Sequence, residues 1–462
     1  MKKSIYSWAL YDWANSAFAT TVMAGFFPIF FAQYWSNPEN LSESTFYLGI
    51  ANSVASIVVV LLAPILGAIA DRGTYKKRFL VFFAFLGILM TAGLSLISQG
   101  MWQLALLIYV IATIGFSGAN TFYDSLLPAV SKNHNVDYVS GLGYALGYIG
   151  GGILIVINFL MITEPYSVNI FGFIGFFQST EFPFVSIGTD TVRGIKWSFI
   201  SVALWWAIFS IPILLFVKEP KYHKTETTLQ TIKSGFKQLK NTFNEIRHLK
   251  VVFTFLIAYW LYIDGVDTTV RMAADFGITI GFDSTTIMGA LVLVQFIAFF
   301  ATLLYVKFSD KIGIKNAIYF AIAAYMIIII SGYFVTEAWH FYVIAGMIGC
   351  FQGGIQTLSR SFYARIIPED KSAEFFGFFN MWGKFAAVVG PLLMGSVTLI
   401  LSNSMPVDFI QNTEFPFISI EKDQVLSARI GLQSILILFI LGAFVLSKVN
   451  ISEGEKIAKE YL

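Results

Sequence analysis

The segment TEFPFVSI at residues 180–187 recurs almost unchanged as TEFPFISI at residues 413–420, and this duplication decides how the chain is organised. Seven of the eight positions are identical. A second pair supports it, because FYDSLLP at 122–128 and FYARIIP at 362–368 share Phe-Tyr, two apolar residues and proline in register. The members of the two pairs lie 233 and 240 residues apart, so the chain contains two similar halves that read in the same order.

The composition is that of an integral membrane protein. Of the 462 residues 56% are hydrophobic and only 13% are charged, whereas about a quarter of the residues of a soluble protein are charged. Mean hydropathy is +0.71. The net charge of +2 indicates neither a nucleic-acid nor an acidic partner. The single cysteine, Cys350, excludes an internal disulfide framework and is expected to be a buried small apolar residue.

Apolar runs of about 20 residues, the length needed to cross a bilayer, occur twelve times. They cover about 8–35, 46–70, 79–98, 101–130, 138–162, 195–217, 251–280, 285–306, 315–335, 338–367, 373–402 and 426–447. We therefore predict an all-α membrane protein with twelve transmembrane helices in two six-helix parallel repeats. Its parts would be an N-terminal bundle (1–217), a cytoplasmic linker (218–250) and a C-terminal bundle (251–462).

The linker carries eight Lys or Arg residues against three Glu. Apolar residues recur within it at alternating steps of three and four: Leu229, Ile232, Phe236, Leu239, Phe243 and Ile246. This spacing predicts an amphipathic helix. The helix would lie either on the inner leaflet of the membrane or against the underside of the protein itself.

Positive charge is concentrated in the connections that follow the even-numbered spans. These cations are Arg72, Lys76, Lys77, Arg78, Lys132, Lys307, Lys311, Lys315, Arg365 and Lys371. The connections after the odd-numbered spans carry almost none. By the positive-inside rule both termini are predicted to be cytoplasmic, in the inner membrane of the cell.

Two parallel six-span repeats joined by a cytoplasmic linker are the layout of major facilitator transporters. The loop GAIADRGTYKKR at 67–78 and its counterpart SDKIGIK at 309–315 resemble the loop motif of that superfamily. There the aspartate caps a helix end and pairs across the halves to hold one access state. The resemblance thus implies a gating role for four residues: Asp71, Arg72, Asp310 and Lys311.

The run YDWANS at 11–16 is similar to the opening of the vacuole-effluxer branch of this superfamily. That branch contains fungal autophagy-related vacuolar amino-acid exporters and many bacterial members. Asp12 and Asn15 lie three residues apart and so share one helix face near the inner boundary. They would form a cytoplasmic gate or coupling site, or Asp12 would simply accept hydrogen bonds from neighbouring helix ends.

Charged residues interrupt the seventh span, in the stretch YWLYIDGVDTTVRMAAD at 259–275. Asp264, Asp267, Arg271 and Asp275 fall within an arc of roughly 80° of a helix. A charge at mid-membrane costs about 2.5 to 3.5 kcal/mol on insertion scales, so such residues usually face a bundle interior or watery cavity. Arg271 would meet a substrate carboxylate, and Asp264 or Asp267 an ammonium group. Alternatively, Asp267 and Arg271 pair with each other.

In major facilitator transporters spans one, four, seven and ten line the central cavity, and polar residues here follow that pattern. The further candidates for the substrate or coupling-ion site are Asn120 and Asp124 on span four and Gln352 and Gln356 on span ten. Span eleven adds Asn380 and Lys384, which lie four residues apart and so share one helix face. Lys384 would pair with a carboxylate or extend to the inner surface. A coupling proton would be carried by Asp264, Asp267 or Asp124 if the residue is buried.

These features favour a secondary active transporter that moves a small polar or zwitterionic solute by alternating access. Amino acids are the class that the family resemblance favours. The expected partners are this solute, protons or another coupling ion, and the lipid bilayer. The sequence contains no nucleotide-binding or metal-binding motif, so neither a cofactor nor enzymatic activity is expected.

The alternatives are a drug or organic-ion efflux carrier and, from other classes, a channel, a lipid-moving protein or a non-transporting receptor. The two TEFPF segments would each pack on their own half or meet as an outer lid.

Overall fold

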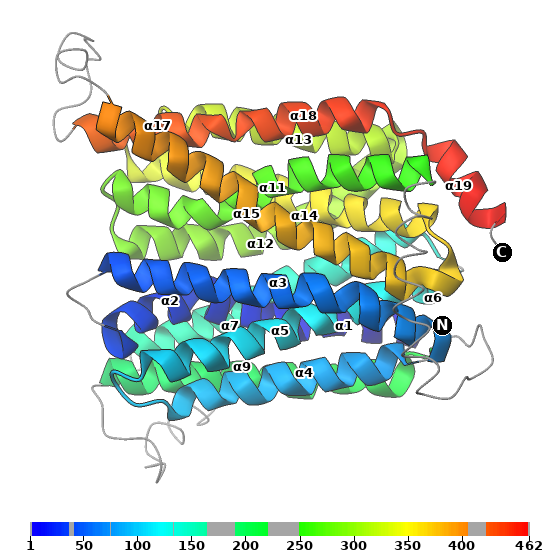
Figure 1. Ribbon diagram of the computed structural model, residues 1–462, viewed down its shortest axis with the longest axis horizontal. Helices are drawn as coiled ribbons and strands as arrows, with labels where there is room; N and C mark the ends of the chain where they lie inside the picture. Colours follow the sequence, from blue (N-terminus) through cyan, green and yellow to red (C-terminus); the bar gives the residue numbers. More distant parts are fainter. Residues whose placement is uncertain are drawn as a thin grey trace. The chain divides into compact units, whose positions relative to one another are not determined.

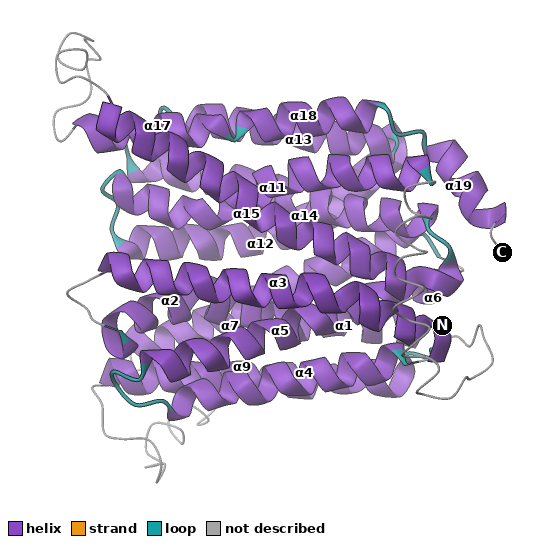
Figure 2. Ribbon diagram, in the orientation of Figure 1, coloured by secondary structure: helices purple, strands orange, loops and turns teal. Residues whose placement is uncertain are grey.

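The computed structural model describes residues 2–36, 41–73, 75–132, 134–163, 190–219, 249–404 and 422–460 (Figure 1). Every regular element in these ranges is helical, and none of the residues in them forms a strand (Figure 2). Two predicted features, the amphipathic stretch at 229–246 and both TEFPF segments, lie outside the described residues.

The helices group into two compact units. The first runs to Asn244 and also includes Ile367–Met381, and the second comprises Glu245–Ile366 and Trp382–Glu460. The helix that begins at Ser372 therefore starts in the first unit, although by sequence it is the eleventh span.

The first unit contains the six predicted spans of the N-terminal half. Its elements are α1 (Lys2–Ala17), η1 (Phe18–Phe26), α2 (Phe27–Phe30), η2 (Phe31–Trp35), α3 (Leu41–Gly73), α4 (Lys76–Gly93), η3 (Leu94–Leu96), α5 (Trp102–Ser125), α6 (Leu127–Ser131), α7 (Val136–Thr163) and α9 (Asp190–Phe216). Within it α1 packs against α7 and α9, and α5 packs against α3 and α4.

The first span is not one continuous α-helix, as the apolar run alone would suggest. Its middle and end, η1 and η2, are wider π-helical turns that flank the short α2. The Thr20 hydroxyl bonds the Ser16 carbonyl at 3.0 Å, and Pro28 has no N–H to continue the ladder. Both features disturb regular α-helical bonding where π-helix replaces it.

The second unit holds the remaining spans and one helix beyond them. Its elements are α11 (Lys250–Thr279), α12 (Ser284–Ile312), α13 (Ile314–Gly332), α14 (Ala338–Ile366), α15 (Ser372–Ser404) from Trp382 onward, α17 (Lys422–Ser434), α18 (Leu436–Ser447) and α19 (Ile451–Glu460). The short helix η5 (Glu369–Lys371) and the first turns of α15 belong to the first unit. The α11 helix is unbroken through its charged stretch. The short helix α19, which follows the last span, packs against α11 and α14 and was not predicted.

Ten helical runs in the described residues are each long and apolar enough to cross a membrane. They coincide with ten of the twelve predicted spans. The other two predicted spans correspond to the run from α1 to η2 and to α15, in which Val389–Thr398 is the apolar stretch. The chain is thus an all-α membrane protein, and its helices fit the twelve-span, two-repeat fold.

Rows of large apolar side chains remain exposed on the helix surfaces, as expected of faces that contact lipid. On α4 the exposed residues are Phe82, Phe85 and Leu89, and on α12 they are Phe300 and Leu304. Their spacing of three or four residues places each row on one helix face. Cys350 is also exposed, so the expectation that it is buried was wrong. Because an apolar residue is equally satisfied by lipid and by a core, the sequence does not distinguish these positions.

Candidate functional site

The Asp71 carboxylate, near the end of α3, caps the beginning of α15. It accepts the backbone N–H groups of Ala373 at 3.1 Å and Glu374 at 2.8 Å. The first N–H groups of a helix have no partner within the helix, and a negative charge there also complements the helix dipole. Gly67, one turn earlier, permits the close approach, because a Cβ atom there would lie 2.5 Å from the Ala373 carbonyl oxygen.

Lys76 completes this arrangement from the first residue of α4. Its ammonium group lies 2.7 Å from an Asp71 carboxylate oxygen and donates to Ser372 Oγ at 2.7 Å. Ser372 Oγ in turn donates to the carbonyl of Ser125, at the end of α5, at 3.0 Å. The Lys76 side chain is only 3% exposed. We refer to Asp71, Lys76, Ser125 and Ser372 as the Asp71 cluster.

The other residues for which the loop motif implied gating lie in the last turns of helices, whereas the sequence predicted them in the connecting loops. Arg72 lies in the last turn of α3, but its side chain is outside the described part of the structure. Asp310 and Lys311 lie at the end of α12, and both are exposed. The two copies of the loop motif therefore differ, since only the first presents a buried aspartate.

Next to the Asp71 cluster, the ends of α4 and α9 cap each other. The Glu219 carboxylate, just beyond α9, accepts the backbone N–H of Lys76 at 2.8 Å and that of Lys77 at 3.3 Å. The Lys77 ammonium group donates to the carbonyls of Leu214 and Val217 at the end of α9, both at 2.7 Å. Burial raises the pKa of Glu219 above its ordinary value, although the two backbone N–H groups oppose the rise.

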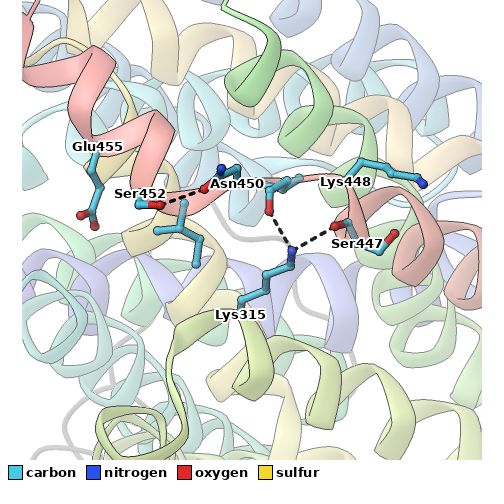
Figure 3. A pocket seen from close by; sticks show the side chains of 8 residues that line it. Lys315, Ser447, Lys448, Asn450, Ser452 and Glu455 are labelled. Carbon is cyan, nitrogen blue, oxygen red and sulfur yellow. Dashed lines mark hydrogen bonds between the residues drawn. The ribbon is translucent and has the colours of Figure 1, made fainter.

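The second repeat contains the equivalent lysine contact. Lys315, at the start of α13, donates to the carbonyls of Ser447 at 3.1 Å and Val449 at 2.7 Å, at the end of α18 (Figure 3). A shallow pocket of about 480 Å³ surrounds this contact. It is lined by Lys315, Ser447, Lys448, Val449, Asn450, Ile451, Ser452 and Glu455. Because Lys315 already bonds two carbonyls, we assign the pocket a helix-end role and no ligand.

The vacuole-effluxer-like run on α1 contacts α5 through two polar pairs. Asn15 Nδ2 donates to the side-chain oxygen of Asn120. The Asp12 carboxylate accepts hydrogen bonds from Ser16 Oγ at 3.2 Å and from the Tyr123 hydroxyl at 3.3 Å. Asp12 is half-buried and Asn15 is buried. The structure thus brings Asp12, Asn15 and Asn120 to one helix contact.

Asp124, one turn beyond Asn120, contacts the first turns of α15. Asn380 Nδ2 donates to the Asp124 carboxylate at 3.3 Å and also to the carbonyl of Phe376 at 3.0 Å. A second contact in this region is the ion pair between Lys132 and Glu369, at 3.5 Å. Together with the Asp71 cluster, these bonds attach the beginning of α15 to α3, α5 and the residues after α6. The side chain of Lys384, further along α15, is outside the described part of the structure.

In the second unit Asp264 is engaged by the protein's own donors. The backbone N–H of Gly390 donates to both carboxylate oxygens of Asp264, at 2.9 and 3.0 Å. The Thr268 hydroxyl donates to one of them at 3.2 Å. The residue is 1% exposed. Pro391 follows Gly390 inside α15. Asp264 therefore joins α11 to α15 at the point where proline interrupts the hydrogen-bond ladder of α15.

The remaining candidates of this unit differ in exposure. Asp267 is half-buried, as are Gln352 and Gln356 on α14, whereas Arg271 is exposed. The side-chain oxygen of Gln352 is buried, and no hydrogen-bond partner is found for it within the described residues. The side chain of Asp275 is outside the described part of the structure. Exposure of the predicted polar residues of α11 thus increases from the buried Asp264, through the half-buried Asp267, to the exposed Arg271.

Sequence reasoning missed several residues that the structure places at these contacts. Lys76 was counted only as a positive-inside charge, and Ser125, Ser372 and Glu219 carried no recognisable signal. Gly390 contributes a backbone N–H, which no sequence pattern indicates. Arg360, inside the tenth span, is 2% exposed, and a charge within an apolar run was the signal that could have identified it. The described residues include no group of three or more His, Cys, Asp or Glu side chains that could hold a metal ion.

Comparison with solved structures supports the fold. The proton:xylose symporter XylE aligns with a TM-score of 0.66 over 98% of this chain and 96% of its own, at 13% identity. The human organic anion transporter MFSD10 aligns with a TM-score of 0.63 over 96% of this chain and 99% of its own, at 11% identity. XylE is a major facilitator protein, and identities this low carry the fold alone.

Sequence relatives define the family more narrowly. An MFS-type transporter of Bacillus subtilis, YxiO, is 36% identical over 404 residues, which cover 87% of this chain and 90% of the relative. Autophagy-related protein 22 of Yarrowia lipolytica is 24% identical over 440 residues, 75% of this chain and 69% of the relative. The family model described as vacuole effluxer Atg22 like matches residues 41–421. The chain therefore belongs to the Atg22-like vacuole effluxer family of major facilitator transporters.

Proposed function

We propose that this protein is a secondary active transporter of a small polar or zwitterionic solute, and that the Asp71 cluster is a gate of its alternating-access cycle. The observation that carries the proposal is the buried Asp71 carboxylate, which bonds the first turn of α15 and the Lys76 ammonium group. Transport by rocking of two repeats requires contacts that form in one state and break in another. Contacts to a helix end suit that role, because they can be made and broken without unfolding either helix.

The cluster is also suited to two discrete states. If α15 moves away, Asp71 loses two N–H donors and Lys76 loses the Ser372 hydroxyl. A buried charged group left without its partners costs several kcal/mol, so partial separation is unfavourable unless water enters to replace the lost bonds. The gate is therefore expected to be either closed and dry or open and hydrated.

For the substrate we propose a zwitterion, with amino acids the favoured class. Arg271 would meet its carboxylate and Asp267 its ammonium group. Asp264 is less suited to bind the ammonium group than the sequence suggested, because Gly390 and Thr268 already occupy its oxygens. It would instead hold α11 against α15 or carry a coupling proton. Polar contacts would come from Gln352, Gln356 and Lys384. Asn120, Asp124 and Asn380 would contribute by exchanging their bonds to Asn15 and to each other for bonds to the substrate.

We further propose that the Asp71 cluster lies at the cytoplasmic side, with both termini, in the inner membrane. This placement is supported by the concentration of Lys and Arg in the connections that follow the even-numbered spans, including Lys76, Lys77 and Arg78 beside the cluster.

Counterflow in proteoliposomes tests the function. Vesicles that contain the purified protein are preloaded with unlabelled amino acids, and uptake of each labelled amino acid is followed. We expect saturable counterflow, reduced at least tenfold in Asp71→Asn and Arg271→Gln, and unchanged in Lys307→Gln, an exposed cation of α12. Uptake at the wild-type rate in both variants would overturn the assignment of these residues. Non-saturable flux would favour a channel, and counterflow of organic anions or drugs alone would favour the efflux alternative.

A further inference from the structure

We infer that Glu219 is a positioning residue for the Asp71 cluster, which couples the start of the linker between the two repeats to the gate. The inference rests on the gating role proposed above. Glu219 is the second residue of the predicted linker (218–250) and the last described residue before 249. Its described hydrogen bonds are to Lys76 and Lys77, and none joins it to Asp71 or to α15. Its effect would pass through the main chain of Lys76.

The geometry that supports this role is a cap at the N-terminus of α4. The two carboxylate oxygens of Glu219 bond the backbone N–H groups of Lys76 at 2.8 Å and Lys77 at 3.3 Å, one oxygen to each. Neither N–H group has a partner within α4, because they belong to its first turn. The cap therefore fixes the backbone from which the Lys76 side chain reaches Asp71 and Ser372. A shift of this turn would move the ammonium group away from both.

The opposite cap, made by Lys77, holds α9 in the same place. Its ammonium group bonds the carbonyls of Leu214 and Val217, while Glu219 extends from the residues that follow them. Each helix end thus receives the charge that its dipole favours, a carboxylate at the start of α4 and an ammonium group at the end of α9. The two contacts together form a reciprocal connection between α4 and α9.

The second repeat has an equivalent of the Lys77 contact but not of the Glu219 contact. Lys315 bonds the end of α18 as Lys77 bonds the end of α9. The position 233 residues after Glu219, the separation of the duplicated segments, is Ser452, whose hydroxyl bonds Asn450. Because both repeats have the lysine contact to a helix end, we assign that contact to the common fold. Of the two repeats, only the first has, within the described residues, a carboxylate that caps the helix carrying the lysine, and this cap lies beside the Asp71 cluster.

The surroundings of Glu219 oppose its ionised form. Three charged groups interact with it: the Lys76 ammonium group, which favours its ionised form, Asp71, which disfavours it, and the Lys77 ammonium group. Burial outweighs the favourable contacts and raises the pKa of Glu219. Its two hydrogen bonds to the turn that carries Lys76 are the contacts through which it would position that lysine.

Hydrogen exchange tests the inference without a known substrate. The full-length protein in lipid nanodiscs is compared with Glu219→Ala, Glu219→Gln and Asp71→Asn, and mass spectrometry follows peptides that cover residues 372–381. We expect Glu219→Ala to raise exchange of these amides by roughly three- to tenfold, the size expected for loss of about one hydrogen bond of local stability. Glu219→Gln, which keeps one acceptor oxygen, should give a smaller rise.

The matched control is Lys315→Gln, which removes the equivalent helix-end contact from the second repeat and should leave exchange at 372–381 unchanged. Exchange in α12 of each variant reports whether the second unit is intact. If Asp71→Asn raises exchange and Glu219→Ala does not, the role of Glu219 is refuted while the gate stands. If Asp71→Asn itself has no effect, the gate is refuted too. A similar rise in α12 of Glu219→Ala would show general loosening and would also overturn the inference.

Discussion

The backbone N–H of Glu374 donates to the Asp71 carboxylate at 2.8 Å, although 303 residues separate the two in sequence. The contact explains why Ile367–Met381 groups with the first unit. The start of the eleventh span is held by residues of the N-terminal repeat, through bonds made at its first turn. A rearrangement at that turn would alter how α15 is attached without requiring any change within the helix.

Gly67→Ala is expected to weaken this attachment. The added methyl group would lie 2.5 Å from the Ala373 carbonyl oxygen and 2.9 Å from the Glu374 Cα, and backbone atoms cannot turn aside. Overpacking of this kind costs about 1–3 kcal/mol, enough to lower the population of the closed gate severalfold. The measurement is cross-linking by a bis-maleimide between cysteines at Lys132 and Glu369, which pair at 3.5 Å, in a Cys350→Ser background.

The control for this experiment is Gly49→Ala on the same helix, where an added Cβ would meet no atom within 4 Å. We expect cross-linking at the unsubstituted level in that control. Equal cross-linking in Gly67→Ala and Gly49→Ala would show that the α3–α15 contact does not require glycine at position 67.

Gly390→Ala is expected to destabilise the second unit. A Cβ atom at this position would overlap Thr268 Oγ1 and lie 2.6 Å from the Asp264 carboxylate. Thr268 is β-branched, so its side chain has few other positions to adopt. We expect a loss of about 1–3 kcal/mol, seen as a lower midpoint of thermal unfolding in detergent. Adding Thr268→Ala should recover part of the loss because it removes the overlapping hydroxyl group.

On the same helix Gly395→Ala provides the comparison, since a Cβ atom there would have no neighbour within 4 Å. Its unfolding midpoint should equal that of the unsubstituted protein. A midpoint for Gly390→Ala that matches Gly395→Ala would contradict the close Asp264–Gly390 contact.

The C-terminal helix α19 is expected to depend on packing more than on its ion pair. A Cβ atom at Gly454 would lie 2.8 Å from a methyl group of Ile366 and 2.9 Å from one of Val251, so Gly454→Val should displace α19. Glu455 pairs with Arg365 at 3.7 Å, but both side chains are about one-third exposed, and such pairs contribute about 0–1 kcal/mol. Limited proteolysis should cleave Gly454→Val near α19 much faster than Glu455→Gln, and equal rates would refute this ranking.

Glu219 is expected to make stability depend on pH. Its pKa is raised in the folded protein above the ordinary value of 4.5, so between these two values the folded state binds more protons than the unfolded state. The stability from this group is fully present below the unfolded pKa and is lost as the pH rises through the folded pKa. Glutamine at this position has no such dependence.

The difference between the unfolding midpoints of Glu219→Gln and the unsubstituted protein should therefore become more positive as the pH rises above about 4.5, and then level off. A difference that stays constant from pH 4.5 to 8 would indicate that Glu219 is not buried in the folded protein. Histidines do not affect this comparison, because they are the same in both proteins.

How far the candidate site could be predicted varied with the kind of signal. Asp71 was identified because its loop resembles the superfamily motif, and Asp264 because a carboxylate inside an apolar span is costly and therefore conspicuous. Their partners were not, because a backbone N–H of Ala373 or Gly390 leaves no mark in a sequence. Nor could spacing along one helix reveal that Asn15 meets Asn120 and that Asp124 meets Asn380, since those pairs join different helices.

The sequence by itself determined the membrane class, the number of spans and the two parallel repeats, because each depends on local hydropathy or on internal similarity. It also identified the family through the run at Tyr11 to Ser16. Only the tertiary structure decided that α15 begins against α3 and α5, that Glu219 caps α4 while Lys77 caps α9, and that Asp264 is bound to Gly390. These contacts depend on which helix ends meet in space, and helix packing sets that over separations of more than a hundred residues.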